Sequence, residues 1–525
     1  MANGRPGWLY RYEARGIQRY VTATERLEEV AGASALVEAL KDQASKLAHW
    51  AGGSIIADAA GSATIEFSGA GVQRFAEWWP MIAARVAPGL PMVQAAVDLA
   101  AHDHPLPALR ALLDAAYQRH YTDLPEGGPL VHRSGRSGRP AVARGTRRGK
   151  RDVRDVATDR KVSALKSLQE SGQVGLADDA LGSRFLEGLD TGGRPLVSRH
   201  EDFGDSYVAV IHIDGNDMGM RVLSLPFAGY GGFAEALARA VEDAAQKATA
   251  LVHQEDERRR EARRLRNLPV RVDAPIPMRP IVLGGDDCTI ITLAEDAIPF
   301  ATRFLEVLEE RGRQAVFGGR VLHATAGIAF IKPRAPFSLG LALADELCRF
   351  AKQCLRGLGG NGETPSSVLF HRVTTSGFAA WADISGQELA AVPPGDVKLR
   401  PGGLVYGPYR LRGERSVGRL GCLAATAKAL PSGPLREWLR VARSDPGRSG
   451  LRWQRLKEVT CGRDSCRWDA FQKALRELEA DPESGWGKGQ SMDAHPATPI
   501  HDAITWGMVG TPLTFRAGPD QVTDE

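Results

Sequence analysis

Hydrophobic periodicity divides the middle of the chain into alternating strands and helices. Apolar, β-branched runs that end at glycines mark the strands, and a period of three to four marks the helices, such as the one that carries Phe233, Leu237 and Val241. The predicted order is β-α-β-β-α-β, followed by a further helix and strand. The ranges are Tyr207–Asp214, Phe233–Val252, the hairpin Ile281–Ile291, Asp296–Arg311, Val321–Ile331, Leu339–Leu355 and Ser367–Val373.

The N-terminal part repeats this order. Its predicted elements are Leu9–Tyr20, Leu36–Trp50, the hairpin Ser54–Phe67, Val72–Val86 and Pro91–Leu99. A β-α-β-β-α-β order is the split βαβ, ferredoxin-like arrangement. The sequence therefore predicts an α+β fold with two ferredoxin-like (βαββαβ) units.

The tip of the second hairpin carries two glycines and two adjacent carboxylates, Gly284-Gly285-Asp286-Asp287. The first strand of the same unit ends at Asp214, directly before Gly215. In this topology the first strand and the strand that enters the hairpin run parallel, so Asp214, Asp286 and Asp287 are expected to meet at one sheet edge. Three carboxylates would repel one another there unless divalent cations bind between them. Paired ions of this kind serve phosphoryl and nucleotidyl transfer. For a lone Gly-Gly-Asp-Asp, an ordinary acidic turn is the competing interpretation.

Three motifs together resemble the palm domain of cyclic-nucleotide synthases. They are Asp214-Gly215-Asn216, Gly284-Gly285-Asp286-Asp287, and Ala344-Asp345-Glu346-Leu347 with Ala351-Lys352. That group includes the GGDEF cyclases and the large palm subunit of type III CRISPR effector complexes, and the Asp-Asp form of the hairpin favours the CRISPR branch. The resemblance implies that Asp214, Asp286 and Asp287 are catalytic and hold two ions, Mg²⁺ or Mn²⁺. It also implies that Gly215, Gly284, Gly285 and Lys352 contact the nucleotide, with Lys352 at the triphosphate, although a lysine on a solvated helix face is the alternative.

The N-terminal unit resembles the opening of the same palm subunit through Gly16–Tyr20 and Val30–Leu36. Its hairpin tip, Asp58-Ala59-Ala60-Gly61, has no acidic pair, so this first palm is predicted to be non-catalytic. We expect Gly32 and Ser34 at the start of a helix, where free backbone N–H groups and a serine cap can receive phosphate or ribose oxygens. A serine that only caps the helix is the other interpretation.

The predicted domains are the first palm (1–101), a basic linker with a helical region (102–203), the second palm (204–376) and a loop-rich, then helical, C-terminal domain (377–525). The linker is expected to be a flexible loop that either contacts a nucleic-acid backbone or is only solvated. Its His102-Asp103-His104 does not amount to an HD-type nuclease site, which needs ligands spread over a helical domain. The basic cluster of the linker consists of Arg144, Arg147, Arg148, Lys150, Arg151 and Arg154.

Composition narrows the function classes only slightly. A net charge of +4 on 525 residues does not by itself indicate nucleic-acid binding. The six cysteines form no Cys-x-x-Cys, so reduced structural thiols are expected, and a zinc site at Cys461 and Cys466 is not. Without a run of eighteen apolar residues or an N-terminal signal core, we expect a cytoplasmic protein with no membrane partner.

The resemblance implies a metal-dependent nucleotidyltransferase that joins ATP into cyclic oligoadenylate-type messengers. It would act within a type III CRISPR-like antiviral effector, with crRNA, target RNA and small helical and repeat-type subunits as partners. The alternatives are a stand-alone palm cyclase that works without guide RNA, and a catalytically silent palm scaffold. Polymerases share this fold, but nothing in the sequence indicates a channel for a duplex.

Overall fold

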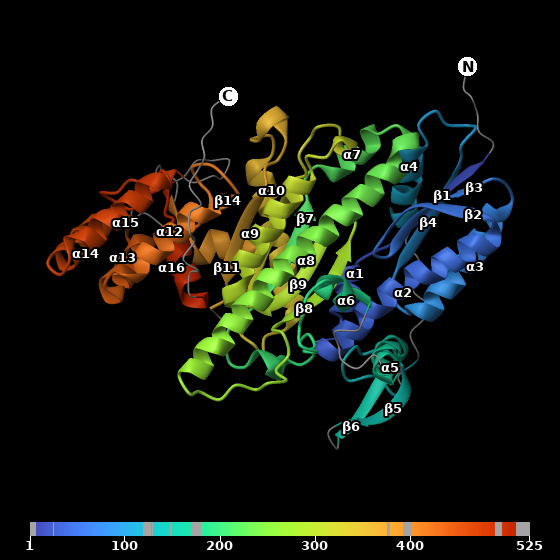
Figure 1. Cartoon of the computed structure of the whole chain (residues 1–525), viewed down its shortest axis with the longest axis horizontal. Coiled ribbons are helices and arrows are strands. Elements are labelled where there is room, and N and C mark those ends of the chain that lie inside the picture. The colour runs from blue at the N-terminus through green and yellow to red at the C-terminus, as the bar shows by residue number, and fades with distance from the viewer. Residues whose placement is uncertain are drawn as a thin grey trace.

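The computed structural model describes residues 7–24, 26–118, 128, 130–147, 150–170, 180–374, 379–391, 402–488 and 496–510. Figure 1 shows three parts along the longest axis of the molecule. The N-terminal unit lies at one end, the second unit lies in the middle, and a group of C-terminal helices lies at the other end.

The N-terminal unit is a four-stranded antiparallel sheet with the strand order β2-β3-β1-β4. Tyr10 and Tyr12 of β1 pack against Phe75 and Trp79 of α3, so helices α2 and α3 cover this face. On the other face, Leu9 packs with apolar residues of α4. The bounds are β1 Trp8–Ala14, α1 Ile17–Val21, α2 Leu27–Ala51, β2 Gly53–Ala59, β3 Ser62–Phe67, α3 Gly71–Val86, β4 Met92–Asp98 and α4 Pro105–Gln118.

The second unit is built on a six-stranded sheet with the order β14-β11-β10-β7-β9-β8. Its central strand β7 is buried from Val208 to Ile213. Odd-numbered residues of this strand belong to the hydrophobic core on one face of the sheet, and Val208 and Val210 belong to the core on the other face. Helices α8 and α9 cover one face, and α10 covers the other. The bounds are β7 Val208–Gly215, α7 Met218–Ser224, α8 Phe227–Leu265, β8 Met278–Gly284, β9 Asp287–Leu293, α9 Ala294–Arg311, β10 Ala324–Ile331, α10 Phe337–Leu355, β11 Ser367–Arg372 and β14 Tyr409–Arg410.

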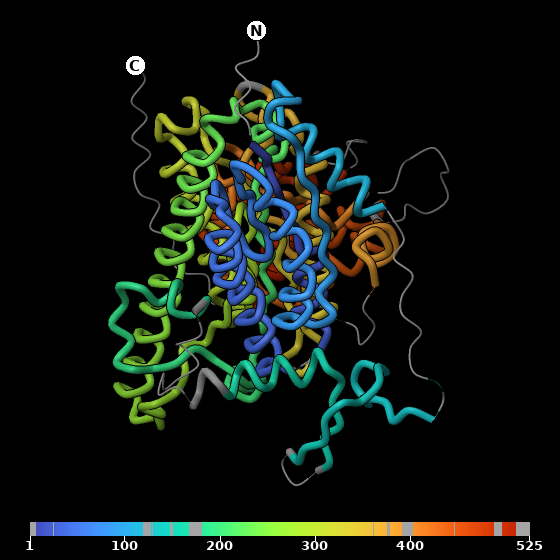
Figure 2. The backbone as a smooth tube through the Cα atoms, turned by 90° about the vertical axis from the view of Figure 1, so that its right-hand side faces the viewer, coloured from blue at the N-terminus to red at the C-terminus, as the bar shows by residue number. Residues whose placement is uncertain are grey.

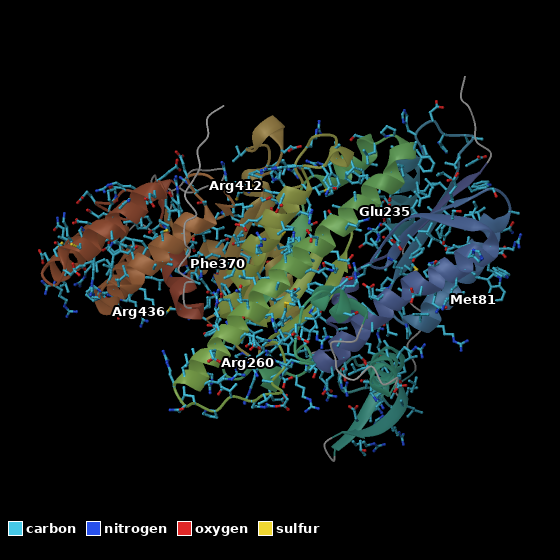
Figure 3. All side chains as sticks on the ribbon, in the orientation of Figure 1. Met81, Glu235, Arg260, Phe370, Arg412 and Arg436 are labelled. Atoms are coloured by element: carbon cyan, nitrogen blue, oxygen red, sulfur yellow. The ribbon has the colours of Figure 1, made fainter. Side chains whose placement is uncertain are left out.

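Helix α8 packs against both units. Figure 3 labels Glu235 in the first third of this helix and Arg260 near its end. Its first turns pack against β2 of the N-terminal unit, where Gly231 lies beside Ile56, and the rest of the helix packs on α9 and β8. Movement of one unit relative to the other would therefore have to displace this helix.

The basic linker is not a flexible loop through its centre, which corrects the sequence prediction. It forms the hairpin β5 Ala141–Arg147 and β6 Lys150–Asp155, followed by α5 Val156–Glu170 and α6 Ala180–Leu186. Ion pairs hold the hairpin, because Arg154 contacts Asp159 at 3.2 Å and Arg136 bridges Asp152 and Glu29. Helix α5 packs along α2, while the hairpin itself stands away from the body of the molecule (Figure 2). Arg148 lies outside the described residues.

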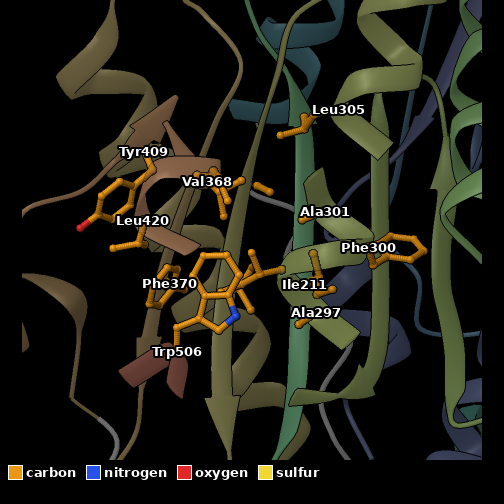
Figure 4. Close-up of a cluster of buried hydrophobic side chains, with 14 of the residues drawn as sticks. Ile211, Ala297, Phe300, Ala301, Leu305, Val368, Phe370, Tyr409, Leu420 and Trp506 are labelled. Atoms are coloured by element: carbon orange, nitrogen blue, oxygen red, sulfur yellow. The ribbon is translucent and has the colours of Figure 1, made fainter. Parts of the chain in front are cut away.

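The C-terminal helices share a core with the second unit. Figure 4 shows Leu420 of α12 and Trp506 of α16 beside Phe370 of β11 and Ile211 of β7. The sequence predicts short helices at Cys422–Leu430, Leu435–Ala442, Leu451–Val459 and Trp468–Leu478, which overlap α12 to α15, whereas it does not predict α16. The bounds are α12 Val417–Lys428, α13 Ser432–Ser444, α14 Pro446–Cys461, α15 Ser465–Glu477 and α16 Ile500–Val509.

Two smaller expectations can be checked directly. All six cysteines are free; Cys288 and Cys348 are buried as structural thiols would be, whereas Cys422 and Cys466 are exposed. Within the described part of the chain, no helix combines the length and apolarity that a bilayer crossing requires. The predicted domain boundaries stay predictions.

Candidate active site

The end of β7 and the tip of the β8–β9 hairpin meet at one edge of the second sheet. Asp214 is the penultimate residue of β7, Asp286 lies in the turn, and Asp287 begins β9. A carboxylate oxygen from each of the three lies within 4.8 Å of the other two. The structure thus brings together the residues that the topology predicted to converge, although their roles as ligands and catalysts stay predictions.

Glycines make this close approach possible. A Cβ atom at Gly215 would lie 2.6 Å from the Cβ of Asp286, so any side chain at position 215 would push the acidic tip away. A Cβ atom at Gly284 would lie 2.4 Å from the backbone nitrogen of Ala60, at the hairpin tip of the N-terminal unit. Gly285 has φ +63°, a conformation that favours glycine. The three glycines therefore shape the site, and their predicted contact with nucleotide is not tested.

Lys352 of α10 reaches the same strand end. Its Nζ donates to the carboxylate of Asp214 and, at 2.8 Å, to the backbone carbonyl of Gly215. The lysine is therefore not on a free solvated face, because it is paired inside the acidic cluster. Whether it also contacts a triphosphate remains a prediction.

The cluster is electrostatically strained without a cation. Burial, and then the charge of Asp214, raise the pKa of Asp286 to about 6. The same two causes, with the charge of Asp286 added, raise the pKa of Asp287 well above its ordinary value. Lys352 offsets only part of this effect. A half-buried set of carboxylate oxygens with surplus negative charge is the donor set that Mg²⁺ and Mn²⁺ prefer, so these residues fit such ions.

The loop after Asp214 is held by Asn216, a residue that carried no assigned role in the sequence motif. The side chain of Asn216 is buried, donates to the carbonyls of Thr364 and Pro365 at 3.1 Å each, and accepts from Thr325 at 3.0 Å. Its backbone N–H donates to the carbonyl of His323. These bonds fix the backbone at the point where Asp214 leaves the sheet. An asparagine two residues after a strand-end aspartate was the signal available in the sequence.

A cavity of about 560 Å³ opens beside the acidic tip, between the two units. Asp286 lies at its edge, and its walls come from β1 and α4 of one unit and from α7 and α8 of the other. The volume falls in the range that nucleotide-sized ligands occupy. Apolar and charged side chains both line it, among them Arg11, Glu13, Leu109, Met218, Tyr230 and Phe233.

Solved structures with the same fold come from the Csm1-Csm4 cassette. The crystal structure of that cassette in complex with cA4 matches with a TM-score of 0.51 at 12% identity, over 96% of this chain and 70% of the other. The corresponding complex with cA3 matches with a TM-score of 0.49 at 13% identity over the same shares. The chain shares the fold of a Csm1-Csm4 cassette subunit. No protein-family model and no curated protein matches it.

Gly32 and Ser34 do not sit at a helix start, which corrects the sequence prediction. Helix α2 begins at Leu27, so both residues lie inside it, and both are buried. The Ser34 hydroxyl is already bonded to the carbonyls of Val30 and Ile281, the latter at 2.8 Å. A Cβ atom at Gly32 would lie 2.1 Å from the carbonyl oxygen of Lys161. Both residues pack α2 against its neighbours, and neither offers a free group to a nucleotide.

Proposed function

We propose that this chain is a nucleotidyltransferase that joins ATP into cyclic oligoadenylate. The observation that carries the proposal is the convergence of Asp214, Asp286 and Asp287 beside Lys352, at the edge of a cavity of about 560 Å³ between two units. We further propose that these units, with strand orders β4-β1-β3-β2 and β10-β7-β9-β8, are two ferredoxin-like palm domains.

In this proposal Asp214, Asp286 and Asp287 hold two divalent cations, Mg²⁺ or Mn²⁺. Such ions, when bound, lower the pKa of an attacking 3′-hydroxyl and neutralise the charge on a leaving pyrophosphate. Lys352 offers a positive charge to the triphosphate. Its bonds to Asp214 and to the carbonyl of Gly215, beside the acidic tip that borders the cavity, support that role. The cavity walls shield the bound nucleotides from water.

The choice of ATP and of a cyclic product rests on similarity. The solved structure with a TM-score of 0.51 is a complex with cA4, and the sequence motifs of this chain resemble the palm of type III CRISPR effectors. We extend the proposal to a role in such an effector, with another subunit, as in the Csm1-Csm4 cassette, and with crRNA and target RNA as partners.

Labelled ATP, incubated with Mg²⁺ or Mn²⁺ and with or without candidate target RNA, tests the activity when products are resolved by mass. The double variant Asp286→Ala, Asp287→Ala should abolish product while keeping the circular dichroism spectrum. A matched control removes two exposed carboxylates of α8, Glu235→Ala with Glu261→Ala, and should retain turnover.

The outcomes separate the alternatives. Product that forms without RNA, from protein that carries no co-purified RNA, would favour a stand-alone cyclase. A wild-type protein that binds ATP and cations, yet forms no product with any RNA tested, would favour a palm scaffold. Product that persists in the double variant would refute the proposed site.

A further inference from the structure

A histidine and a cysteine lie on the other side of Asp214 from the hairpin tip. His212 precedes Asp214 by two residues on β7, so both side chains leave the same face of the sheet. Cys348 lies on α10, one helical turn before Lys352. One ligand atom each from His212, Asp214 and Cys348 lie within 4.8 Å of one another. The proposed nucleotidyl transfer uses neither His212 nor Cys348.

His212 is oriented as a ligand would be. Its ring is buried, and Nδ1 lies 3.1 Å from the hydroxyl of Thr289 and 3.1 Å from the side-chain amide of Gln18. Nε2 binds an ion in the tautomer whose Nδ1–H donates to the Thr289 hydroxyl, with the Gln18 amide turned so that its oxygen faces the ring. Within the described residues Nε2 makes no hydrogen bond, and Oδ1 of Asp345 lies 3.9 Å from it. Metal-binding histidines are held in this way, with one ring nitrogen fixed by a polar partner and the other directed at the ion.

Cys348 is the donor that distinguishes this cluster from the neighbouring carboxylates. Its Sγ lies 3.3 Å from the carbonyl oxygen of Thr325, to which the thiol donates. Packing alone explains a small buried residue here, because the backbone of α10 at Cys348 lies close against Gly327 of β10. Packing does not explain why the sulfur also lies within 4.8 Å of a histidine nitrogen and of a carboxylate oxygen.

We propose that His212, Asp214 and Cys348 form a second cation site, for a transition-metal ion of the zinc class. A nitrogen, a sulfur and an oxygen donor suit zinc or cobalt, whereas Mg²⁺ takes oxygen ligands almost exclusively. Asp345, on the same helix face as Cys348, is placed to supply a fourth ligand. Coordination replaces the thiol proton of Cys348, which leaves to solvent. The exposed parts of Asp214 and Asp345 provide the entry path.

The shared ligand makes the site regulatory, and this part rests on the proposed function. Asp214 belongs both to the all-oxygen set with Asp286 and Asp287 and to the mixed set with His212 and Cys348. A zinc-class ion in the mixed set withdraws Asp214 from the oxygen set and adds positive charge beside Lys352. It should therefore inhibit turnover even when Mg²⁺ is abundant.

Cobalt absorption tests binding without any turnover. The full-length protein is titrated with Co²⁺, with a thiolate-to-cobalt charge-transfer band as the readout. The wild type and Cys354→Ser, a control on the same helix outside the cluster, should both give the band. Cys348→Ser should lose it and bind Co²⁺ at least about tenfold more weakly, and His212→Gln should weaken binding to a similar degree. No band in the wild type, or an undiminished band in Cys348→Ser, would overturn the site.

Zinc inhibition is measured separately, as the ratio of product formed with and without Zn²⁺ in excess Mg²⁺. The ratio should fall at least tenfold in the wild type and in Cys354→Ser, and much less in Cys348→Ser. Equal inhibition of all three would overturn the regulatory role. If no protein forms product, the proposed function fails, while the cobalt result still decides the site.

Discussion

Replacing Asp286 by asparagine should stabilise the cation-free protein. Asp286 is half-buried in the acidic cluster, and its pKa is raised from 3.8 to about 6 by burial and by the charge of Asp214. The folded state therefore holds the proton more tightly than the unfolded chain does. Ionising this carboxyl at neutral pH costs the folded state free energy, which a neutral amide of nearly the same shape avoids.

The expected size follows from the two pKa values. The interval from 3.8 to about 6 corresponds to about 3 kcal/mol, at about 1.4 kcal/mol per pH unit. Because the side chain is only half-buried, solvent screening reduces this to about 1–3 kcal/mol. The penalty is absent below about pH 4, where the group is protonated in both states, grows between about pH 4 and 6, and is complete above that.

Scanning calorimetry in the presence of a chelator is the appropriate assay. The second unit, residues 204–374, contains no tryptophan, so its unfolding cannot be followed by tryptophan fluorescence from within the unit. Its transition in Asp286→Asn should lie about 2–12 °C above wild type at pH 7.5, and the two should coincide near pH 4. Added Mg²⁺ should stabilise the wild type more than the variant. The control Glu235→Gln, on an exposed face of α8, should change nothing. A variant that melts at or below wild type at pH 7.5 without Mg²⁺ would refute the electrostatic reasoning.

Two further predictions concern neighbouring residues. Lys352→Met should lower kcat/KM for ATP about 10–100-fold, which is the loss expected for a charge-assisted contact. The control Arg349→Met, on the exposed side of α10, should leave kcat/KM unchanged. A loss of stability without a loss of kcat/KM would instead show that Lys352 has a structural role. Gly32→Ala and Ser34→Ala should each destabilise the protein by about 1–3 kcal/mol in urea unfolding and leave KM for ATP within about twofold. A raised KM at unchanged stability would instead show that these residues contact the nucleotide.

Strand ends and turns were predictable because their signals are local. Continuous apolar runs place the ends of β7 and β8 to within a few residues, and glycines at the hairpin tip indicate the turn. The convergence of Asp214 with Asp286 and Asp287 then follows from connectivity alone, since the β-α-β-β order leaves those ends at one sheet edge. No side-chain detail was needed for that inference.

The basic linker was mispredicted because charge was counted without its pairing. Arginines at Arg136 and Arg154 look like a solvated or RNA-binding run in the sequence. In the structure their partners are Asp152, Asp159 and the distant Glu29 of α2. A partner more than one hundred residues away leaves no mark on local composition, so the hairpin could not be distinguished from a loop.

The predicted role of Ser34 as a helix cap or nucleotide contact was wrong because its partner is distant in the sequence. The sequence predicts a helix from Leu36, which makes Ser34 a cap, but α2 begins at Leu27 and passes over the edge strand β8. Strand β8 has a register shift between Pro280 and Val282, so Ile281 is the bulged residue, which has no paired residue on β9. The Ser34 hydroxyl donates to the carbonyl of Ile281. An unpaired buried carbonyl costs about 1–3 kcal/mol, so a small polar residue on α2 is needed at the point where the N-terminal unit crosses the bulge. Because the bulge lies three residues before Gly284, the same contact holds the N-terminal unit against the strand that carries the acidic tip.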